Sequence, residues 1–316
     1  MDQAVQHSPF HAGERAAQAR AGVSLAGAPI RDVMTDQHRS FFALLPFLPV
    51  ATRDARGMPV ATILAGPPGF VTSPDPRTLC IAARRDPADP ASAWLVPGAP
   101  AGILGIDLAT RRRNRANGRI HGVDEASLAI AVEQSYGNCP QYIQARDLMA
   151  SEASTGLVEH LDALDVAARA LVQGADTFFV GSSAGPAGGA DMSHRGGRPG
   201  FVCVREDTLA IPDFRGNRYF NTLGNFLLDP RAALLFPDFA TGDVLHLSGS
   251  VEVDWDAAGV VLGAERVWRV RVEQAWRRRG ALPWRWRWRF RDSAPTTVRT
   301  GTWSGNPERG ACDNGR

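Results

Sequence analysis

The segment richest in groups that could do chemistry is Ser193–Phe201, which reads SHRGGRPGF. It combines a hydroxyl, an imidazole and two guanidinium groups with glycines, which let a ligand approach the backbone closely. The same composition is typical of a polar hairpin loop, and this segment by itself does not separate the two interpretations. The candidate ligand-binding residues in it are Ser193, His194, Arg195 and Gly196.

A second segment, Pro212–Asn221, leads into a predicted helix and carries the candidates Arg215, Asn217 and Arg218. Arginine and asparagine at a helix N-terminus are suited to a phosphate group, because the first N–H groups of a helix have no partner within it. The alternative is that Asn217 is an ordinary N-cap and that Arg218 faces solvent.

The third candidate is a basic cluster, Thr110–Arg115, from which we single out Arg112, Arg113 and Asn114. Charge runs usually face solvent. This run lies between two strand-like segments, however, and has no counterpart elsewhere in the chain, which favours an anionic ligand. His194 is a weak candidate for acid–base catalysis and His246 a weaker one, and neither lies in a pattern that assigns it a role.

The composition excludes several classes of protein. The chain contains no lysine, which rules out Schiff-base enzymes, Walker A nucleotide sites and protein kinases. The four cysteines are far apart, so we predict no metal site, and Cys139 is expected to be structural. The absence of an 18-residue apolar run and of a secretory signal predicts a cytoplasmic protein that does not enter membranes.

Nucleic-acid binding is also not predicted. The net charge is only +2, which is too small for a general polyanion binder. Tryptophan and arginine alternate along Trp284–Arg291. Such interleaving can bind single strands, but a strand that packs its tryptophan face on the core explains it better.

The chain contains a repeat. The sequence around Gly66–Val71 recurs at Gly197–Val202, 131 positions later, and the same spacing relates Asp107 to Asp238 and Gly118 to Gly249. A third match, between Val132–Gln134 and Val272–Gln274, is 140 positions apart. An insertion of nine residues around Trp255–Glu265 accounts for the difference. We therefore predict a duplicated domain whose halves pack as a pseudo-twofold pair.

Each half is expected to be mainly β with a little helix. Short strands separated by Gly/Pro turns predict small closed barrels rather than a βαβ sheet. The predicted divisions are a poorly ordered N-terminal segment at 1–30, a first barrel at 31–150, a second barrel at 151–292 and a C-terminal tail at 293–316.

Five segments carry a resemblance to a known family: Pro49–Thr52, Gly66–Val71, Asn138–Ile143, Ser193–Phe201 and Asp213–Asn225. Together they resemble the pyridoxamine 5′-phosphate oxidase-related proteins of the FMN-binding split-barrel superfamily, over Asp36 to Trp276. The resemblance implies a mainly β (α+β) fold of two tandem split barrels with short flanking helices. Single barrels of this superfamily dimerise around FMN, so this chain resembles such a dimer joined head to tail, and a further homodimer is expected.

The resemblance implies an FMN-dependent oxidoreductase with a small-molecule substrate and an external electron donor, either NAD(P)H or a reductase. FAD or a deazaflavin could replace FMN. The oxidases of this family contact FMN and substrate partly through lysine, and this chain has no lysine. The resemblance therefore does not imply that vitamin B6 is the substrate. The alternative function is a flavin- or deazaflavin-binding protein with little turnover.

Overall fold

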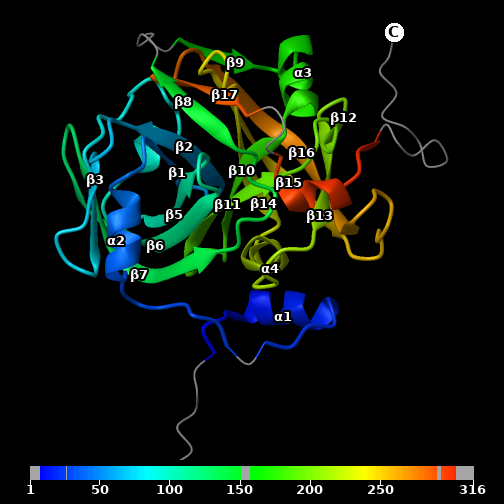
Figure 1. Ribbon diagram of the computed structural model, residues 1–316, viewed down its shortest axis with the longest axis horizontal. Helices are drawn as coiled ribbons and strands as arrows, with labels where there is room; N and C mark the ends of the chain where they lie inside the picture. The colour runs from blue at the N-terminus through cyan, green and yellow to red at the C-terminus, as the bar shows by residue number, and fades with distance from the viewer. Residues whose placement is uncertain (1–7, 26, 151–156, 290–292, 304–316) are drawn as a thin grey trace, which may run out of the picture.

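Two antiparallel sheets make up most of the protein. The computed structural model describes residues 8–25, 27–150, 157–289 and 293–303 (Figure 1). The first sheet contains β1 (Phe47–Arg53), β2 (Pro59–Ala65), β3 (Val71–Thr72), β4 (Thr78–Ile81), β5 (Pro100–Asp107), β6 (Arg112–Val123) and β7 (Leu128–Asn138). The second contains β10 (Thr177–Ser183), β11 (Ala190–Gly196), β12 (Cys203–Arg205), β13 (Thr208–Phe214), β14 (Arg231–Pro237), β15 (Val244–Asp254) and β16 (Ala264–Arg278).

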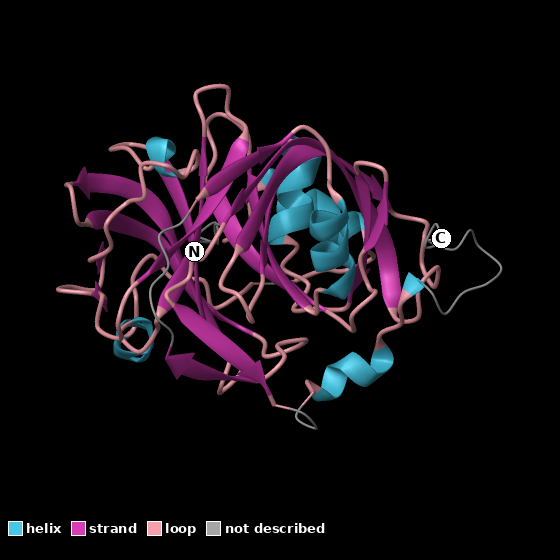
Figure 2. Cartoon of the chain, turned by 90° about the horizontal axis from the view of Figure 1, so that it is seen from above, coloured by secondary structure: helices cyan, strands magenta, loops and turns pink. Residues whose placement is uncertain are grey.

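The helices are short, as Figure 2 shows. They are α1 (Ala12–Arg20), α2 (Asp36–Phe42), α3 (Val166–Gly174), α4 (Asn221–Leu228) and the 3-10 turns η1 (Ser92–Trp94) and η2 (Pro295–Arg299). Strand β9 (Val158–Leu161) extends the second sheet by pairing with β16, and β8 (Arg146–Ala150) pairs with β17 (Trp284–Trp288) in a separate ribbon. The predicted fold class, mainly β with short helices, is confirmed.

Local sequence signals explain where several elements begin and end. The turn between β1 and β2 is Asp54–Gly57. The Asp54 carboxylate accepts from the N–H groups of Arg56 and Met58, and Gly57 has φ 77°. Helices α2 and α3 start at side-chain caps, Thr35 and Asp165.

The two sheets have the same strand order. In the first it is β2-β1-β5-β6-β7-β4-β3, and in the second β11-β10-β14-β15-β16-β13-β12. Each strand of the first sheet thus has a counterpart at the same position in the second sheet, with a strand number that is higher by nine. This arrangement is consistent with two tandem split barrels.

The repeated residues occupy equivalent positions in the two sheets. Gly118 lies at a bulge of β6 opposite Val132, and Gly249 lies at a bulge of β15 opposite Val272. A side chain at either glycine would come within 1.9 Å of a carbonyl oxygen on the neighbouring strand. Five of the extra nine residues lie in the connection between β15 and β16 (255–263, against 124–127 in the first half), and the other four lengthen the start of β16, so the insertion lies in the predicted region.

The two sheets share a core, as the pseudo-twofold prediction requires. Phe47, Ile63 and Leu104 of the first sheet pack with Phe179 and Leu235 of the second. The contacts are reciprocal, since β5 touches β11 while their counterparts β14 and β2 touch each other. The predicted shared interface is therefore confirmed.

The N-terminal segment differs from the expectation of poor order at 1–30. Residues 12–20 form α1, which starts with a capping box between His11 and Glu14. Helix α1 packs on α4 at two facing glycines, because a side chain at Gly13 would come within 2.2 Å of the Gly224 carbonyl oxygen. This long-range contact orders the segment, and nothing in the local sequence predicts it.

The predicted strand near the C-terminus forms over Trp284–Trp288, but only Trp286 is buried on the core, and Trp288 is 45% exposed. Trp286 is buried against Phe47 and Phe239, with ring centroids 5.3 and 5.7 Å apart, whereas Arg287 is exposed. The rest of the alternating run, at 290–291, lies outside the described residues. No helix in the described part of the chain is long and apolar enough to cross a bilayer.

The bulge glycines provide a test of the fold. We expect Gly118→Ala to lower the free energy of unfolding by roughly 2–3 kcal/mol, because the new methyl group would overlap the Ala131 carbonyl. The control is Gly174→Ala at the end of α3, where the methyl group meets nothing within 4 Å and helix propensity favours alanine. Urea unfolding of both variants measures the difference, and equal stabilities would contradict the bulge geometry.

Candidate functional site

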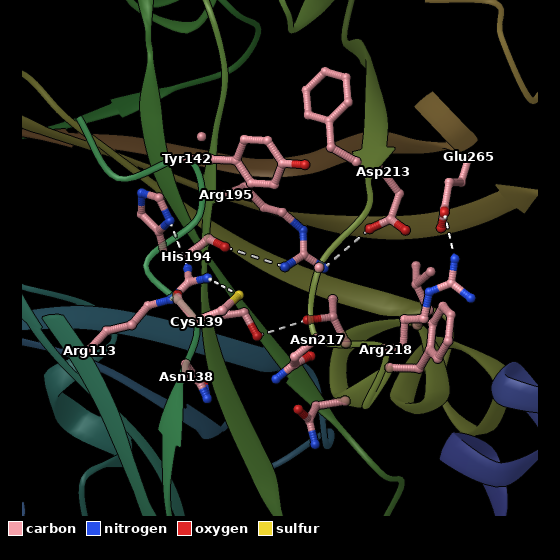
Figure 3. A pocket seen from close by; sticks show the side chains of 18 of the residues that line it. Arg113, Asn138, Cys139, Tyr142, His194, Arg195, Asp213, Asn217, Arg218 and Glu265 are labelled. Atoms are coloured by element: carbon pink, nitrogen blue, oxygen red, sulfur yellow. Dashed lines mark hydrogen bonds and ion pairs between the residues drawn. The ribbon is translucent and has the colours of Figure 1, made fainter. Parts of the chain in front are cut away.

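A pocket lies where the two sheets meet the N-terminus of α4 (Figure 3). Its enclosed volume is about 100 Å³. The walls come from the ends of β6 and β7, from β11 and β13, and from the loop that leads into α4. The polar residues that line it are Arg113, Arg115, Asn138, Cys139, Tyr142, Ser193, His194, Arg195, Asp213, Asn217, Arg218, Asn221, Thr222, Glu265 and Arg266.

Strand β6 supplies two arginines to the pocket, Arg113 and Arg115. Side chains alternate between the two faces of a strand, so Arg112 and Asn114 point the other way. The Arg112 guanidinium lies 4.9 Å from the Phe41 ring centroid, and Asn114 lies beside Gly137 of β7. The expectation that these two residues contribute to the site is therefore wrong, because the strand turns them away from it.

The guanidinium of Arg113 is held by neutral acceptors. It donates from Nε to the Cys139 carbonyl at 2.8 Å, and its Nη atoms lie 2.9 Å from His194 Nδ1 and 3.5 Å from Cys139 Sγ. Burial lowers the pKa of Arg113. It has no carboxylate partner among the described residues, so a half-buried positive charge is left without compensation.

The imidazole of His194 is a positioning group for Arg113. Because arginine can only donate, Nδ1 accepts and the ring proton lies on Nε2. Burial, followed by the charge of Arg113, lowers the pKa of His194 well below its usual value. We therefore interpret His194 as a neutral acceptor rather than an acid or base. His246 lies outside the pocket, on β15, and burial lowers its pKa to about 4.

The other arginines of the pocket are paired with acids. Arg195 lies 3.8 Å from Asp213 and Arg218 lies 3.1 Å from Glu265, while Arg266 touches both of these acids at 2.7 and 3.0 Å. Burial raises the pKa of Asp213. Arg215 is exposed and does not line the pocket, which corrects the expectation for that residue.

The loop before α4 is strained where it faces the pocket. Arg218 and Phe220 have φ values of 63° and 62°, the left-handed region that residues with side chains rarely adopt. Phe220 is the N-cap of helix α4 and provides no side-chain hydrogen bond, and the first three residues of the helix, 221–223, line the pocket. Such strain, on the order of 1–3 kcal/mol per residue, is concentrated in proteins at functional sites.

A buried polar network lies behind the pocket. Arg115 of β6 donates to Asp191 of β11 at 3.1 Å and to Ser193, and Asp191 also accepts from Asn117 and Asn225 at 2.7 and 2.9 Å. Ser193 in turn accepts from Thr222 of α4 at 2.8 Å. The network joins the two sheets to α4 and holds the floor of the pocket.

The structure places most of the predicted site residues together. Those that line the pocket are Ser193, His194, Arg195, Gly196, Asn217, Arg218 and Arg113. Sequence reasoning missed Arg115 and Asn138 as site residues, together with the pairing acids Asp213 and Glu265. The alternation of strand faces would have found Arg115, which lies two residues from Arg113.

Helix α1 closes the network from outside. Glu14 is buried, and its carboxylate accepts from the Asn221 side chain and, at 2.8 Å, from the N–H of His11. Burial and the nearby charge of Asp191 raise the pKa of Glu14 to about 7. Asn221 is the first residue of α4 and lines the pocket, so α1 orients one pocket side chain.

Comparison with known proteins gives partial matches only. No family model and no curated protein matches the chain. Part of it is similar to a variant of HupZ from Group A Streptococcus (11% identity, TM-score 0.30, 36% of this chain and 98% of that chain). It is also similar to a candidate pyridoxamine 5′-phosphate oxidase from Lactobacillus delbrueckii (17%, 0.28, 34% and 95%) and an FAD-binding protein from Mesorhizobium loti (15%, 0.28, 39% and 98%).

The raised pKa of Glu14 makes stability depend on pH. Between about pH 4.5, its ordinary pKa, and about pH 7 the folded chain holds a proton on Glu14 that the unfolded chain releases. The free energy of unfolding therefore falls as the pH rises through this window, by about 3 kcal/mol in all, and levels off above it.

We expect Glu14→Gln to remove this component, so that stability measured by urea unfolding falls less between pH 5 and pH 8 than in the unmodified protein. Glu252→Gln, on an exposed strand position, is the control and should follow the unmodified protein. Parallel curves for all three proteins would show that Glu14 does not titrate as stated.

Proposed function

We propose that the pocket binds FMN and that the chain is an FMN-dependent oxidoreductase. The observation that carries the proposal is Arg113, a preorganised guanidinium that lacks a carboxylate partner among the described residues and is aimed into a pocket shared by both halves. A chain without lysine must bind a phosphate through arginine, hydroxyl and backbone N–H groups. All three kinds of donor meet here.

The charge of the pocket suits a phosphate monoester. Five arginines line it against two acids, Asp213 and Glu265. Asp191 offsets the charge of Arg115 from behind, which leaves an excess of two positive charges. A phosphate monoester carries a charge between about −1.5 and −2 at neutral pH. The uncapped first turn of α4 adds N–H groups at the same place.

The size of the pocket limits how the ligand enters. The cavity volume is about 100 Å³, whereas typical small-molecule pockets begin at roughly 300 Å³. A cavity of this size accommodates a phosphate-sized group, and the rest of the flavin would lie outside it. Tyr142 and Phe214, with ring centroids 5.7 Å apart, line the same pocket and offer aromatic surface.

FMN, when bound, supplies the redox chemistry, and the protein supplies binding and orientation. Arg113, Arg218 and the start of α4 would hold the phosphate, while His194 keeps Arg113 in place. Reduction by external NAD(P)H or a reductase, followed by transfer of the two electrons to a small-molecule substrate, which is thereby reduced, would complete the proposed activity. FAD differs from FMN by an added nucleotide, and deazaflavins differ from FMN within the ring system. The three ligands therefore differ in mass, and mass spectrometry of the extracted ligand identifies the cofactor.

One observation favours the alternative, a flavin-binding protein with little turnover. His194 is the only histidine that lines the pocket among the described residues, and it is buried and held as a neutral acceptor. It is therefore not available to exchange protons with a substrate. Addition of NADH or NADPH to the yellow protein separates the two functions, since bleaching supports the oxidoreductase.

Two neighbouring arginines test the proposed phosphate site. Arg113→Ala should weaken FMN binding by roughly 10- to 150-fold, the effect of losing one charge-assisted hydrogen bond. Arg112→Ala is the matched control, because that side chain lies over Phe41 on the opposite face of β6. Fluorescence titration of FMN into both folded variants gives the affinities. Equal affinities for the two would remove Arg113 from the site.

Cys139 contacts Arg113 mainly through its backbone, which is the basis of a second prediction. The carbonyl accepts the shorter bond, at 2.8 Å, and the sulfur lies at 3.5 Å. Cys139→Ser keeps the carbonyl and replaces the sulfur by another acceptor, so FMN affinity should change by less than about threefold. Loss of FMN from a well-folded Cys139→Ser protein would assign the thiol itself a role in binding.

A further inference from the structure

The matching strand order of the two sheets implies a second place equivalent to the pocket. The pocket lies beside β6, β7, β11 and α4, whose counterparts are β15, β16, β2 and η1. The 131-residue spacing relates Arg113 to Val244, Arg115 to His246 and Ser193 to Thr62. The strand registers agree, because Arg115 faces Tyr136 across β6 and β7 just as His246 faces Trp276 across β15 and β16.

Side chains of the protein fill this second place. His246 stacks on Trp276 with ring centroids 4.8 Å apart, and its Nδ1 lies 3.1 Å from the Ala61 carbonyl oxygen of the first sheet. Both rings are buried, with exposed fractions of 1% and 4%. The equivalent pair beside the pocket, Arg115 and Tyr136, is buried as well, but Arg115 reaches the pocket wall, whereas His246 bonds to the backbone of the other sheet.

Its charges are also compensated internally. Arg278, the counterpart of Asn138, pairs with Asp86 at 2.9 Å and with Asp89 at 3.1 Å, and Asp89 accepts a further hydrogen bond from Thr62. The counterpart of Arg113 is Val244, which carries no charge. The counterparts of Arg113, Arg115 and Arg195 are thus Val244, His246 and Leu64, none of which carries a guanidinium.

The backbone donors of the pocket are missing as well. Helix α4 has eight residues, and its first turn lines the pocket, whereas its counterpart η1 is a single 3-10 turn of three residues. So short an element presents neither the row of N–H groups nor the aligned dipoles of an α-helix N-terminus. The side chains, the charge and the backbone donors of the second place therefore each favour anion binding less than those of the pocket do.

We infer that each chain binds one anionic ligand rather than two, because at the pseudo-symmetric second place Val244 replaces Arg113, Arg278 is already paired with two acids, and a single 3-10 turn replaces the N-terminus of α4. The inference rests on the proposed function for the identity of the ligand. A pair of barrels with two equivalent sites requires the same ligand-binding residues at both places. In this chain the pocket has those residues, and the second place has core residues instead.

The test is the number of ligands bound per chain. FMN is titrated into the full-length protein at a protein concentration well above the dissociation constant, and one FMN per chain is expected. Inorganic phosphate, titrated in parallel by calorimetry, should also saturate at one per chain. Two equivalents of either probe would overturn the inference while leaving the proposed function in place.

A matched pair of variants assigns the single site. Ser193→Ala and Thr62→Ala remove hydroxyls at equivalent positions. Ser193→Ala should weaken FMN binding about 3- to 10-fold, and Thr62→Ala should leave both affinity and stoichiometry unchanged. If Thr62→Ala weakens FMN binding and Ser193→Ala does not, the ligand binds at the second place and the inference is overturned. If FMN does not bind but phosphate saturates at one per chain, the flavin assignment fails and the single anion site stands.

Discussion

The ion pair between Arg115 and Asp191 is the contact on which the rest of the site depends. Both side chains are buried, so each charge is tolerated only while the other remains within hydrogen-bond distance. One partner lies on β6 of the first sheet and the other on β11 of the second. The pair therefore ties the packing of the two halves to the geometry of the pocket, and removal of either side chain would leave an uncompensated charge in the core.

The same carboxylate also places α4. Asp191 accepts from Asn225 on that helix, and Ser193, which Arg115 contacts, accepts from Thr222 one turn earlier. Because the helix start is fixed by these bonds, the strained residues Arg218 and Phe220 are held against the pocket. A polar network whose members are bonded to one another specifies a single arrangement more strongly than apolar contacts do.

The two halves show how one fold can produce two different interiors. At equivalent positions one half has Arg113, Asn138 and Ser193 on the pocket wall, while the other has Val244, Arg278 and Thr62. In the first case a cation is left without an acid, and in the second Arg278 is paired with Asp86 and Asp89. An open pocket loses packing contacts and so lowers stability. A chain with one pocket instead of two keeps those contacts at the second place, where they stabilise the interface between the two halves.

Much of the architecture followed from the sequence alone. The 131-residue spacing that relates Gly118 to Gly249 predicted a duplicated domain, and both glycines lie at equivalent bulges, where a side chain would overlap a neighbouring carbonyl. The segments around Ser193 and Arg218 were recognised as site candidates because their residue types are those that bind phosphate. Such conclusions rest on short stretches of chain, whose chemistry and steric limits are present before folding.

Other features were decided only by tertiary packing. The phase of β6 determines that Arg113 and Arg115, not Arg112 or Asn114, enter the pocket, and a one-residue change in phase would reverse this. Helix α1 is ordered by the approach of Gly13 to Gly224, two residues far apart in the chain. The pairing of Arg115 with Asp191 and the closure of the second place by Trp276 likewise depend on which side chains meet across the two halves. Burial and charge compensation arise from those meetings, so no local pattern could determine them.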